Sequence, residues 1–270
     1  MLPDTPLIML PGICCDGWFF RHQAHAFARC TDGSPRHVIV PEWIAHVDPR
    51  DGTGALQRLA GRLSTAWHEA GLDGAVVVGH SMGGFVAALA CGAGRFKPSA
   101  VLLLDSSIPV PPDRRPFLRE LGVRMQACAD PDAGVRRNRM LDLQREFVLQ
   151  HLASASDDRT ILDEIIVRMA AADPLRCGVL LQAASVVDMT PSLKRMPGRL
   201  VALAADPTRI PIDLLLAVRP DVELARLPMV GHFLQVLAPE PVNTAIACVL
   251  RGEPLRGAGM EPMVPARASA

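Results

Sequence analysis

The 270-residue sequence has no excess of charge of either sign. Lys and Arg together number 28, and Asp and Glu together also number 28. No net field would therefore gather a nucleic acid or an anionic lipid surface. No basic cluster is interleaved with aromatic residues, and no apolar run is long enough to span a bilayer. We expect neither a nucleic-acid-binding protein nor a membrane protein.

Metal, cofactor and disulfide signatures are also missing. The seven cysteines are odd in number, show no C-x-x-C spacing and include the adjacent pair Cys14 and Cys15, so neither a zinc site nor a disulfide framework is indicated. No glycine-rich phosphate loop of the G-K-[ST] type is present. Residues 1–6 lack the basic stretch and apolar core of a secretion signal. We expect a cytoplasmic protein that needs no metal and no cofactor.

What the chain does have is apolar content, 49% against 21% charged residues, which is ample for a buried core. Short apolar runs alternate with stretches of helical periodicity, as in a mostly parallel sheet covered by helices on both faces. The expected strands are residues 7–10, 38–40, 75–78, 101–104, 200–203 and 222–227.

One stretch, residues 109–189, breaks this alternation and contains no convincing strand. Apolar residues at helical spacing from Ile161 to Met169 mark one helix, and Asp173 followed by Pro174 predicts the start of another. We interpret this stretch as a helical lid over the sheet, with Phe117 and Phe147 as its only aromatic residues and a mostly apolar pocket beneath it.

The domain organisation follows from these patterns. We expect residues 1–108 and 190–250 to form the α/β core and residues 109–189 to form the lid. Residues 251–270 are rich in Gly, Pro, Ala and Arg, which predicts a disordered tail.

The most informative motif is Gly79-His80-Ser81-Met82-Gly83-Gly84. It lies between the apolar run 75–78 and an alanine-rich apolar stretch, so Ser81 is expected on a sharp turn from strand to helix. Such a turn strains the serine backbone and leaves no room for side chains at the flanking glycines. It also exposes the serine hydroxyl to a base, as in a nucleophile elbow.

A serine hydroxyl needs an imidazole to take its proton and a carboxylate to orient that imidazole. His232 follows the last expected core strand and precedes the last helix, so it should emerge at the same sheet edge as Ser81; His80 is expected to pack structurally. Asp206 follows the strand 200–203 and is the acid we favour. Asp105 also ends a strand at that edge and is the alternative.

Backbone N–H groups are expected to stabilise the negative charge that develops on an attacked carbonyl oxygen. The N–H of Met82, at the start of the helix after Ser81, is one candidate. The loop after the first strand should supply the other, with Ile13 favoured and Cys14 as the alternative.

Together, the Gly12 loop, the Ser81 motif, Asp206-Pro207 and Gly231-His232 resemble the α/β-hydrolase fold superfamily, in its lidded serine esterase-like branch. The resemblance spans about residues 7–250 and implies a helical lid inserted after the sixth strand of that fold. Relatives commonly carry His-Gly before the oxyanion loop, where this chain has Pro11-Gly12. Because the donor is a backbone amide, this change does not threaten the chemistry.

These patterns predict a serine hydrolase that uses Ser81, His232 and Asp206 to cleave an ester, thioester, lactone or amide of a small, mostly apolar molecule, with water as second substrate. One alternative is a carbon-carbon bond hydrolase of the ring-fission type on the same triad. Another is a ligand-binding protein on a hydrolase scaffold. The sequence indicates no oligomeric state.

Overall fold

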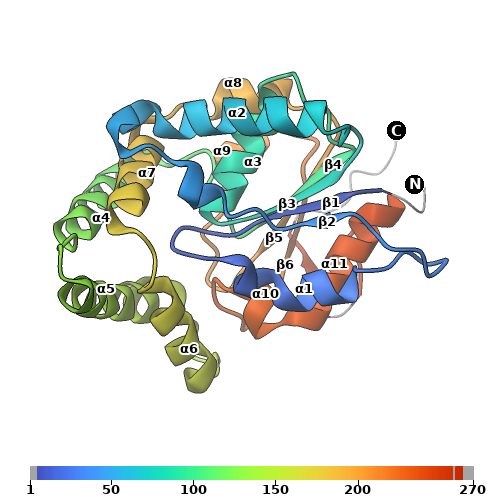
Figure 1. The fold of residues 1–270 in the computed structure, drawn as a ribbon. Helices are drawn as coiled ribbons and strands as arrows, with labels where there is room; N and C mark the ends of the chain where they lie inside the picture. The colour runs from blue at the N-terminus through green and yellow to red at the C-terminus, as the bar shows by residue number, and fades with distance from the viewer. Residues whose placement is uncertain (1–4, 258, 264–270) are drawn as a thin grey trace.

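The protein is built around a seven-stranded sheet (Figure 1). The computed structural model describes residues 5–257 and 259–263. The strand order is β2-β1-β3-β4-β5-β6-β7, and all neighbours are parallel except β6 and β7, which are antiparallel. The strands are β1 (Leu7–Leu10), β2 (Val38–Ile39), β3 (Val76–His80), β4 (Ala100–Leu104), β5 (Arg199–Ala204), β6 (Glu223–Arg226) and β7 (Glu261–Pro262).

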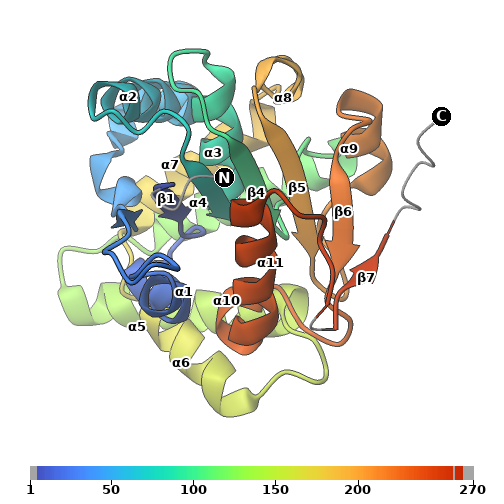
Figure 2. The same ribbon diagram turned by 90° about the vertical axis from the view of Figure 1, so that its right-hand side faces the viewer.

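Both faces of the sheet are buried, because successive side chains of each strand point to opposite faces and nearly all are apolar. In β1, Leu7 and Met9 join one apolar cluster, and Ile8 and Leu10 join the other. One face is covered by α2 (Ala55–Glu69), α3 (Met82–Gly92), α8 (Thr190–Arg195) and α9 (Ile212–Val218), and the other by α1 (Arg21–Ala26), α10 (Leu234–Leu237) and α11 (Pro239–Arg251) (Figures 1 and 2).

Between β4 and β5 the chain forms a run of helices that lies beyond one end of the sheet (Figure 1). We call residues 109–189 the helical segment. Its helices are α4 (Arg115–Ala127), α5 (Ala133–Phe147), a turn of π-helix (Val148–Leu152), α6 (Arg159–Met169) and α7 (Pro174–Val186).

Aspartates set the starts of three of these helices. The side chains of Asp132, Asp158 and Asp173 each accept two backbone N–H bonds from the first turn of α5, α6 and α7, which satisfies donors that have no partner within the helix. Helices α4 and α7 pack closely where Gly122 meets Gly178. A Cβ atom on Gly122 would lie 2.7 Å from the Gly178 carbonyl oxygen.

This architecture confirms the predicted fold class, a mostly parallel sheet with helices on both faces. Along this chain the helical segment follows the fourth strand, β4. The expected disordered tail is wrong for residues 251–257 and 259–263, because β7 pairs with β6 and the Met263 N–H donates to the Leu224 carbonyl at 3.1 Å. Residues 258 and 264–270 of that expectation lie outside the described residues. No helix in the described ranges has the length and apolar character needed to cross a membrane.

Candidate active site

Ser81 occupies the turn between β3 and α3. Its backbone has φ 51° and ψ −119°, a region that L-residues rarely adopt and that costs about 1–3 kcal/mol. The turn is held from both sides: the Ser81 N–H donates to the Leu104 carbonyl at 3.0 Å, and the Ser81 carbonyl accepts the Gly84 N–H at 3.0 Å. The strain is therefore imposed by the sheet on one side and by the helix on the other.

The glycines of the motif are required by close backbone packing. A Cβ atom on Gly79 would lie 2.6 Å from the Gly84 Cα, and one on Gly83 would lie 2.1 Å from the Leu10 carbonyl oxygen. A Cβ atom on Gly84 would lie 2.0 Å from the Ser106 hydroxyl. The start of α3 thus packs directly against the ends of β1 and β3, and this places Ser81 at the carboxyl edge of the sheet.

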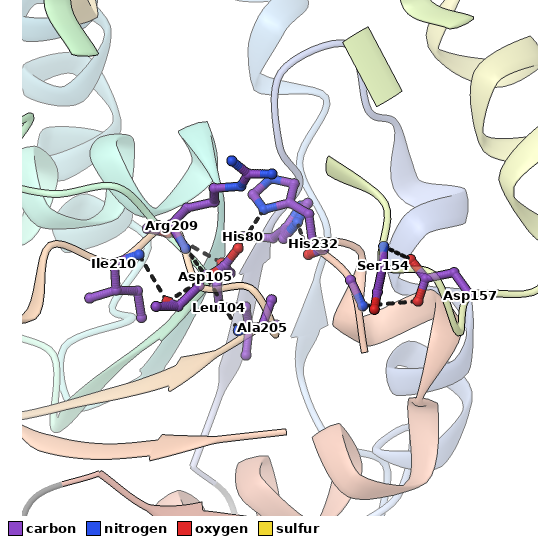
Figure 3. Close-up of polar contacts among 12 residues, drawn as sticks. His80, Leu104, Asp105, Ser154, Asp157, Ala205, Arg209, Ile210 and His232 are labelled. Atoms are coloured by element: carbon purple, nitrogen blue, oxygen red, sulfur yellow. Dashed lines mark hydrogen bonds and ion pairs between the residues drawn. The ribbon is translucent and has the colours of Figure 1, made fainter. Parts of the chain in front are cut away.

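His232 lies between β6 and α10, and its ring contacts a buried carboxylate (Figure 3). The distance from His232 Nδ1 to Asp105 Oδ2 is 2.7 Å, and the two side chains are 6% and 0% exposed. Because Asp105 can only accept, neutral His232 carries its proton on Nδ1. This tautomer leaves His232 Nε2 as a proton acceptor.

Asp105 is positioned by a network that uses both carboxylate oxygens. It follows β4 with φ 42°, and its N–H donates to the Leu203 carbonyl at 2.9 Å. Oδ1 accepts the Ala205 N–H at 3.2 Å, the Thr208 hydroxyl at 3.1 Å and the Arg209 N–H at 2.9 Å. Asp105 therefore joins the end of β4 to the loop after β5 and to His232.

The expectation that Asp206 orients His232 is wrong. Asp206 Oδ2 accepts the Met229 N–H at 3.1 Å, and the Asp206 N–H donates to the Val230 carbonyl at 2.8 Å. Asp206 thus stabilises the loop that leads to His232, and the His232 ring bonds Asp105 instead. The physical reason is sheet order: β4 lies next to β3, which carries Ser81, whereas Asp206 lies beyond the end of β5, one strand further away. Asp105, the alternative acid, holds the contact with His232.

His80 supports the backbone of His232. His80 Nε2 donates to the His232 carbonyl at 3.0 Å, and the two rings lie 4.7 Å apart. Burial lowers the pKa of His80 well below its usual value, and the nearby His232 lowers it further. His80 is therefore neutral at physiological pH. The sequence led us to expect only a packing role for His80, whereas its ring also bonds the backbone of His232.

The two residues expected to stabilise an oxyanion lie beside the same cavity. Ile13 and Met82 line the cavity next to Ser81, and within the described chain neither N–H donates to a protein acceptor. Cys14, the alternative donor, has φ 59°, and its thiol lies against the Met125 sulfur of α4 at 3.9 Å. The left-handed conformation of Cys14 turns the loop so that Ile13, and not Cys14, lines the cavity.

The cavity itself has a volume of about 80 Å³ and lies between the sheet edge and the helical segment. Both Ser81 and His232 line it, although in the described residues the Ser81 hydroxyl makes no hydrogen bond with His232 or with any other group. Such contacts are often loose without substrate and tighten in the complex. The lining residues are Ile13, Ser81, Met82, Phe85, Asp105, Ser107, Arg114, Phe117, Leu118, Phe147, His151, Leu152, Leu181, Arg209 and His232.

A contact that the sequence did not suggest joins the helical segment to the His232 loop. Asp157, which is buried, accepts the Gly231 N–H on Oδ1 at 2.9 Å and the Ser154 N–H on Oδ2 at 2.7 Å (Figure 3). The His232 N–H donates to the Leu152 carbonyl at 2.9 Å. No motif marks Asp157, because its partners are backbone groups 74 and 3 residues away in the chain.

Comparison with known proteins now decides the family. Residues 7–245 match the family model described as the alpha/beta hydrolase family. The chain belongs to the alpha/beta hydrolase family. This finding confirms the resemblance that the motifs indicated.

Solved structures with the same fold include esterases and other hydrolases. This alpha/beta hydrolase is similar to MenH from S. aureus, with 16% identity, a TM-score of 0.71 and coverage of 93% of this chain and 95% of that one. It is also similar to olei00960, a hydrolase from Oleispira antarctica (14%, TM-score 0.73, 93% and 92% covered). A thermophilic esterase from Thermogutta terrifontis is a third example (19%, TM-score 0.64, 92% and 90% covered). At these sequence identities the similarity concerns the fold alone. A search of curated proteins gives no match.

Proposed function

We propose that this protein is a serine hydrolase that cleaves an ester, thioester, lactone or amide bond of a small molecule through an acyl-enzyme intermediate. The observation that carries the proposal is the buried contact of His232 Nδ1 with Asp105 Oδ2, in a cavity that also holds Ser81 on a strained turn. Nucleophile, base and orienting acid thus face one cavity, as general-base activation of a serine requires.

Each residue has a defined part in this chemistry. Ser81 Oγ attacks the carbonyl carbon while His232 Nε2 takes the hydroxyl proton, and the same imidazolium then protonates the leaving group. The Asp105 carboxylate stabilises the imidazolium, and the N–H groups of Ile13 and Met82 hold the oxyanion. Water, activated by His232, then attacks the acyl-Ser81 ester and releases the acid.

The helical segment supplies much of the cavity wall, including Phe117, Leu118, Phe147 and Leu181. We therefore assign it the role of a lid that shields the acyl-enzyme from bulk water, while the one water that reacts enters beside His232. The apolar lining favours a small substrate with a mostly apolar part.

Covalent labelling tests this proposal directly. A fluorophosphonate probe should add to Ser81 of the wild-type protein, as read by mass spectrometry of the labelled peptide. Ser81→Ala should abolish labelling and the hydrolysis of a panel of short methyl and phenyl esters. His232→Ala should slow both reactions by about 10³-fold or more. The control Ser34→Ala, in an exposed loop, should match wild type.

The outcomes separate an enzyme from a binding protein on the same scaffold. Ester turnover that persists in Ser81→Ala contradicts the assignment of the nucleophile. Wild-type protein that neither reacts with the probe nor cleaves any ester of the panel contradicts the proposed hydrolase.

A further inference from the structure

Two arginine side chains face the cavity that holds Ser81. Arg114 directly precedes α4 in the helical segment, and Arg209 lies in the loop between β5 and α9. In the described parts of the chain, neither guanidinium forms an ion pair or a hydrogen bond, and Arg209 Nε is buried without any partner. The other arginines that line hollows of the described residues, such as Arg136, Arg168 and Arg176, lie in hollows that Ser81 does not line.

The unpaired state of Arg209 is costly for the free protein. Partial burial lowers the pKa of Arg209, and the positive charge of Arg114 lowers it further, while Asp105 raises it. Among the residues that the structure describes, Asp105 is the only acidic one on the cavity wall. Its Oδ2 is bonded to His232, and its Oδ1 accepts the Arg209 main-chain N–H and not the guanidinium. The cavity is thus lined by two arginines, Arg209 partly buried and Arg114 largely exposed at its rim, against one carboxylate that is already engaged.

The backbone of Arg209 is also anchored close to the reacting groups. Its backbone N–H is bonded to Asp105 Oδ1, and the same carboxylate holds His232 through Oδ2. Figure 3 shows the Arg209 side chain extending from this anchor toward the His232 ring. The guanidinium is therefore carried by a residue whose backbone is held by the same carboxylate as His232, so a group that it binds would lie close to the reacting groups.

We propose that the substrate carries an acidic group, a carboxylate or a phosphate, that binds Arg209 and Arg114 while its scissile carbonyl lies on Ser81. This inference rests on the proposed hydrolase function. A guanidinium matches the two oxygens of such an anion with parallel N–H bonds. His151, on the wall formed by the helical segment, offers a further donor.

Matched pairs of esters test the proposal with the full-length protein. Monomethyl succinate is compared with methyl 4-methylpentanoate, in which an isopropyl group replaces the carboxylate. Acetoxyacetate and isobutyl acetate form the same comparison on the alcohol side. Methyl 3-phosphonopropanoate distinguishes a phosphate-like anion from a carboxylate. The variants are Arg209→Gln, Arg114→Gln and the control Arg119→Gln, an exposed arginine of α4 away from the cavity.

We expect wild type to show at least about a tenfold higher kcat/KM for an acidic ester than for its neutral partner, because a charge-assisted hydrogen bond contributes about one order of magnitude or more. Arg209→Gln and Arg114→Gln should each lower kcat/KM about tenfold more for the acidic ester than for its neutral partner. Arg119→Gln should change neither. Calorimetry of Ser81→Ala with the preferred acidic ester should show binding that Arg209→Gln weakens about tenfold in the same background.

Equal or higher kcat/KM for the neutral esters on both sides of the bond, with Ser81 still labelled by fluorophosphonate, overturns the acidic substrate and leaves the hydrolase standing. A preference for acidic esters that survives in both arginine variants also overturns it. Loss of Ser81 labelling and of all ester cleavage in wild type instead removes the hydrolase function itself.

Discussion

Replacing Asp105 with asparagine tests the network that orients His232. The amide oxygen can take the place of Oδ1 and keep the bonds from the Ala205 N–H, the Thr208 hydroxyl and the Arg209 N–H. The amide nitrogen then faces His232 Nδ1 and donates to it. Because the ring must now carry its proton on Nε2, it can no longer accept the proton of Ser81.

The expected loss follows from this change of tautomer. In a serine protease triad the same replacement lowers kcat about 10⁴-fold, which corresponds to about 5.5 kcal/mol of transition-state stabilisation. Three of the four bonds to the side chain are preserved, so the free energy of unfolding should change by about 1 kcal/mol or less. Activity and stability should therefore separate clearly in this variant.

Asp206→Asn is the matched control. Its amide oxygen can still accept the Met229 N–H, so kcat should stay within about threefold of wild type. Both variants are assayed for kcat on the best ester of the panel and for the rate of fluorophosphonate labelling, with urea unfolding as a check on folding. A loss of 10³-fold or more in Asp206→Asn, together with a loss below tenfold in Asp105→Asn, would refute the reasoning.

Three further predictions concern the supports of the site. Because burial lowers the pKa of His80 in the folded protein, the unfolded state binds more protons as the pH falls through the ordinary histidine range. Wild type should therefore lose unfolding free energy between pH 7.5 and 5.5 that His80→Gln does not lose, as measured by urea unfolding. Gly83→Ala should destabilise the folded protein by several kcal/mol, because the new Cβ atom would lie 2.1 Å from a carbonyl oxygen. Gly61 lies in α2 with open space around it, so Gly61→Ala should stabilise the protein by about 0.5–1 kcal/mol. Thermal unfolding measures both changes. Asp157→Asn leaves one side-chain oxygen for two backbone donors. The free energy of unfolding should fall by about 1–3 kcal/mol, as measured by urea unfolding. Because the same contact holds the His232 loop, kcat should also fall in steady-state kinetics.

Each of these three has a result that contradicts it. Equal pH dependence of unfolding in wild type and His80→Gln would show that His80 titrates alike in both states. Gly83→Ala with wild-type stability would contradict the close packing of α3 on β1. Asp157→Asn with unchanged stability and kcat would show that the helical segment does not support His232.

Much of the sheet could be predicted because its strands are buried on both faces and therefore read as continuous apolar runs. The run 101–104 became β4 (Ala100–Leu104) and the run 200–203 became β5 (Arg199–Ala204). Ser81 and His232 could be chosen as candidates because local pattern alone places them: Ser81 at a glycine-bounded turn, and His232 after a strand and before a helix.

The acid could not be chosen in the same way. Asp105 and Asp206 both follow a strand at the same edge, and the order of β4 and β5 in the sheet, which separates them, is not encoded in either local pattern. The strand β7 was missed for a related reason: two residues in a stretch rich in Gly and Pro pair only because β6 offers an edge. Such features depend on contacts between distant parts of the chain.

The sequence did not indicate that Arg114 and Arg209 would line the cavity. The charges of the helical segment nearly balance along the sequence, and several of them form exposed pairs, such as Arg124 with Glu146 and Arg168 with Glu164. Arg114 has no such partner and faces the cavity. Charge balance over a segment thus says little about the charge of the cavity that the segment covers.

The size of the cavity limits how a substrate can enter. Its volume of about 80 Å³ is roughly half that of an engineered cavity that holds benzene, so any ester of the proposed kind must displace part of the wall. The sheet side cannot give way readily, because Ser81, Met82 and His232 are held by the strand ends and by the Asp105 network. The opposite wall belongs to the helical segment and consists mostly of apolar side chains, such as Phe117 and Leu118, with Arg114 and His151 beside them. The apolar side chains form no hydrogen bond that would resist movement. We therefore expect substrate to enter by displacing this wall, while the reacting groups keep the geometry described above.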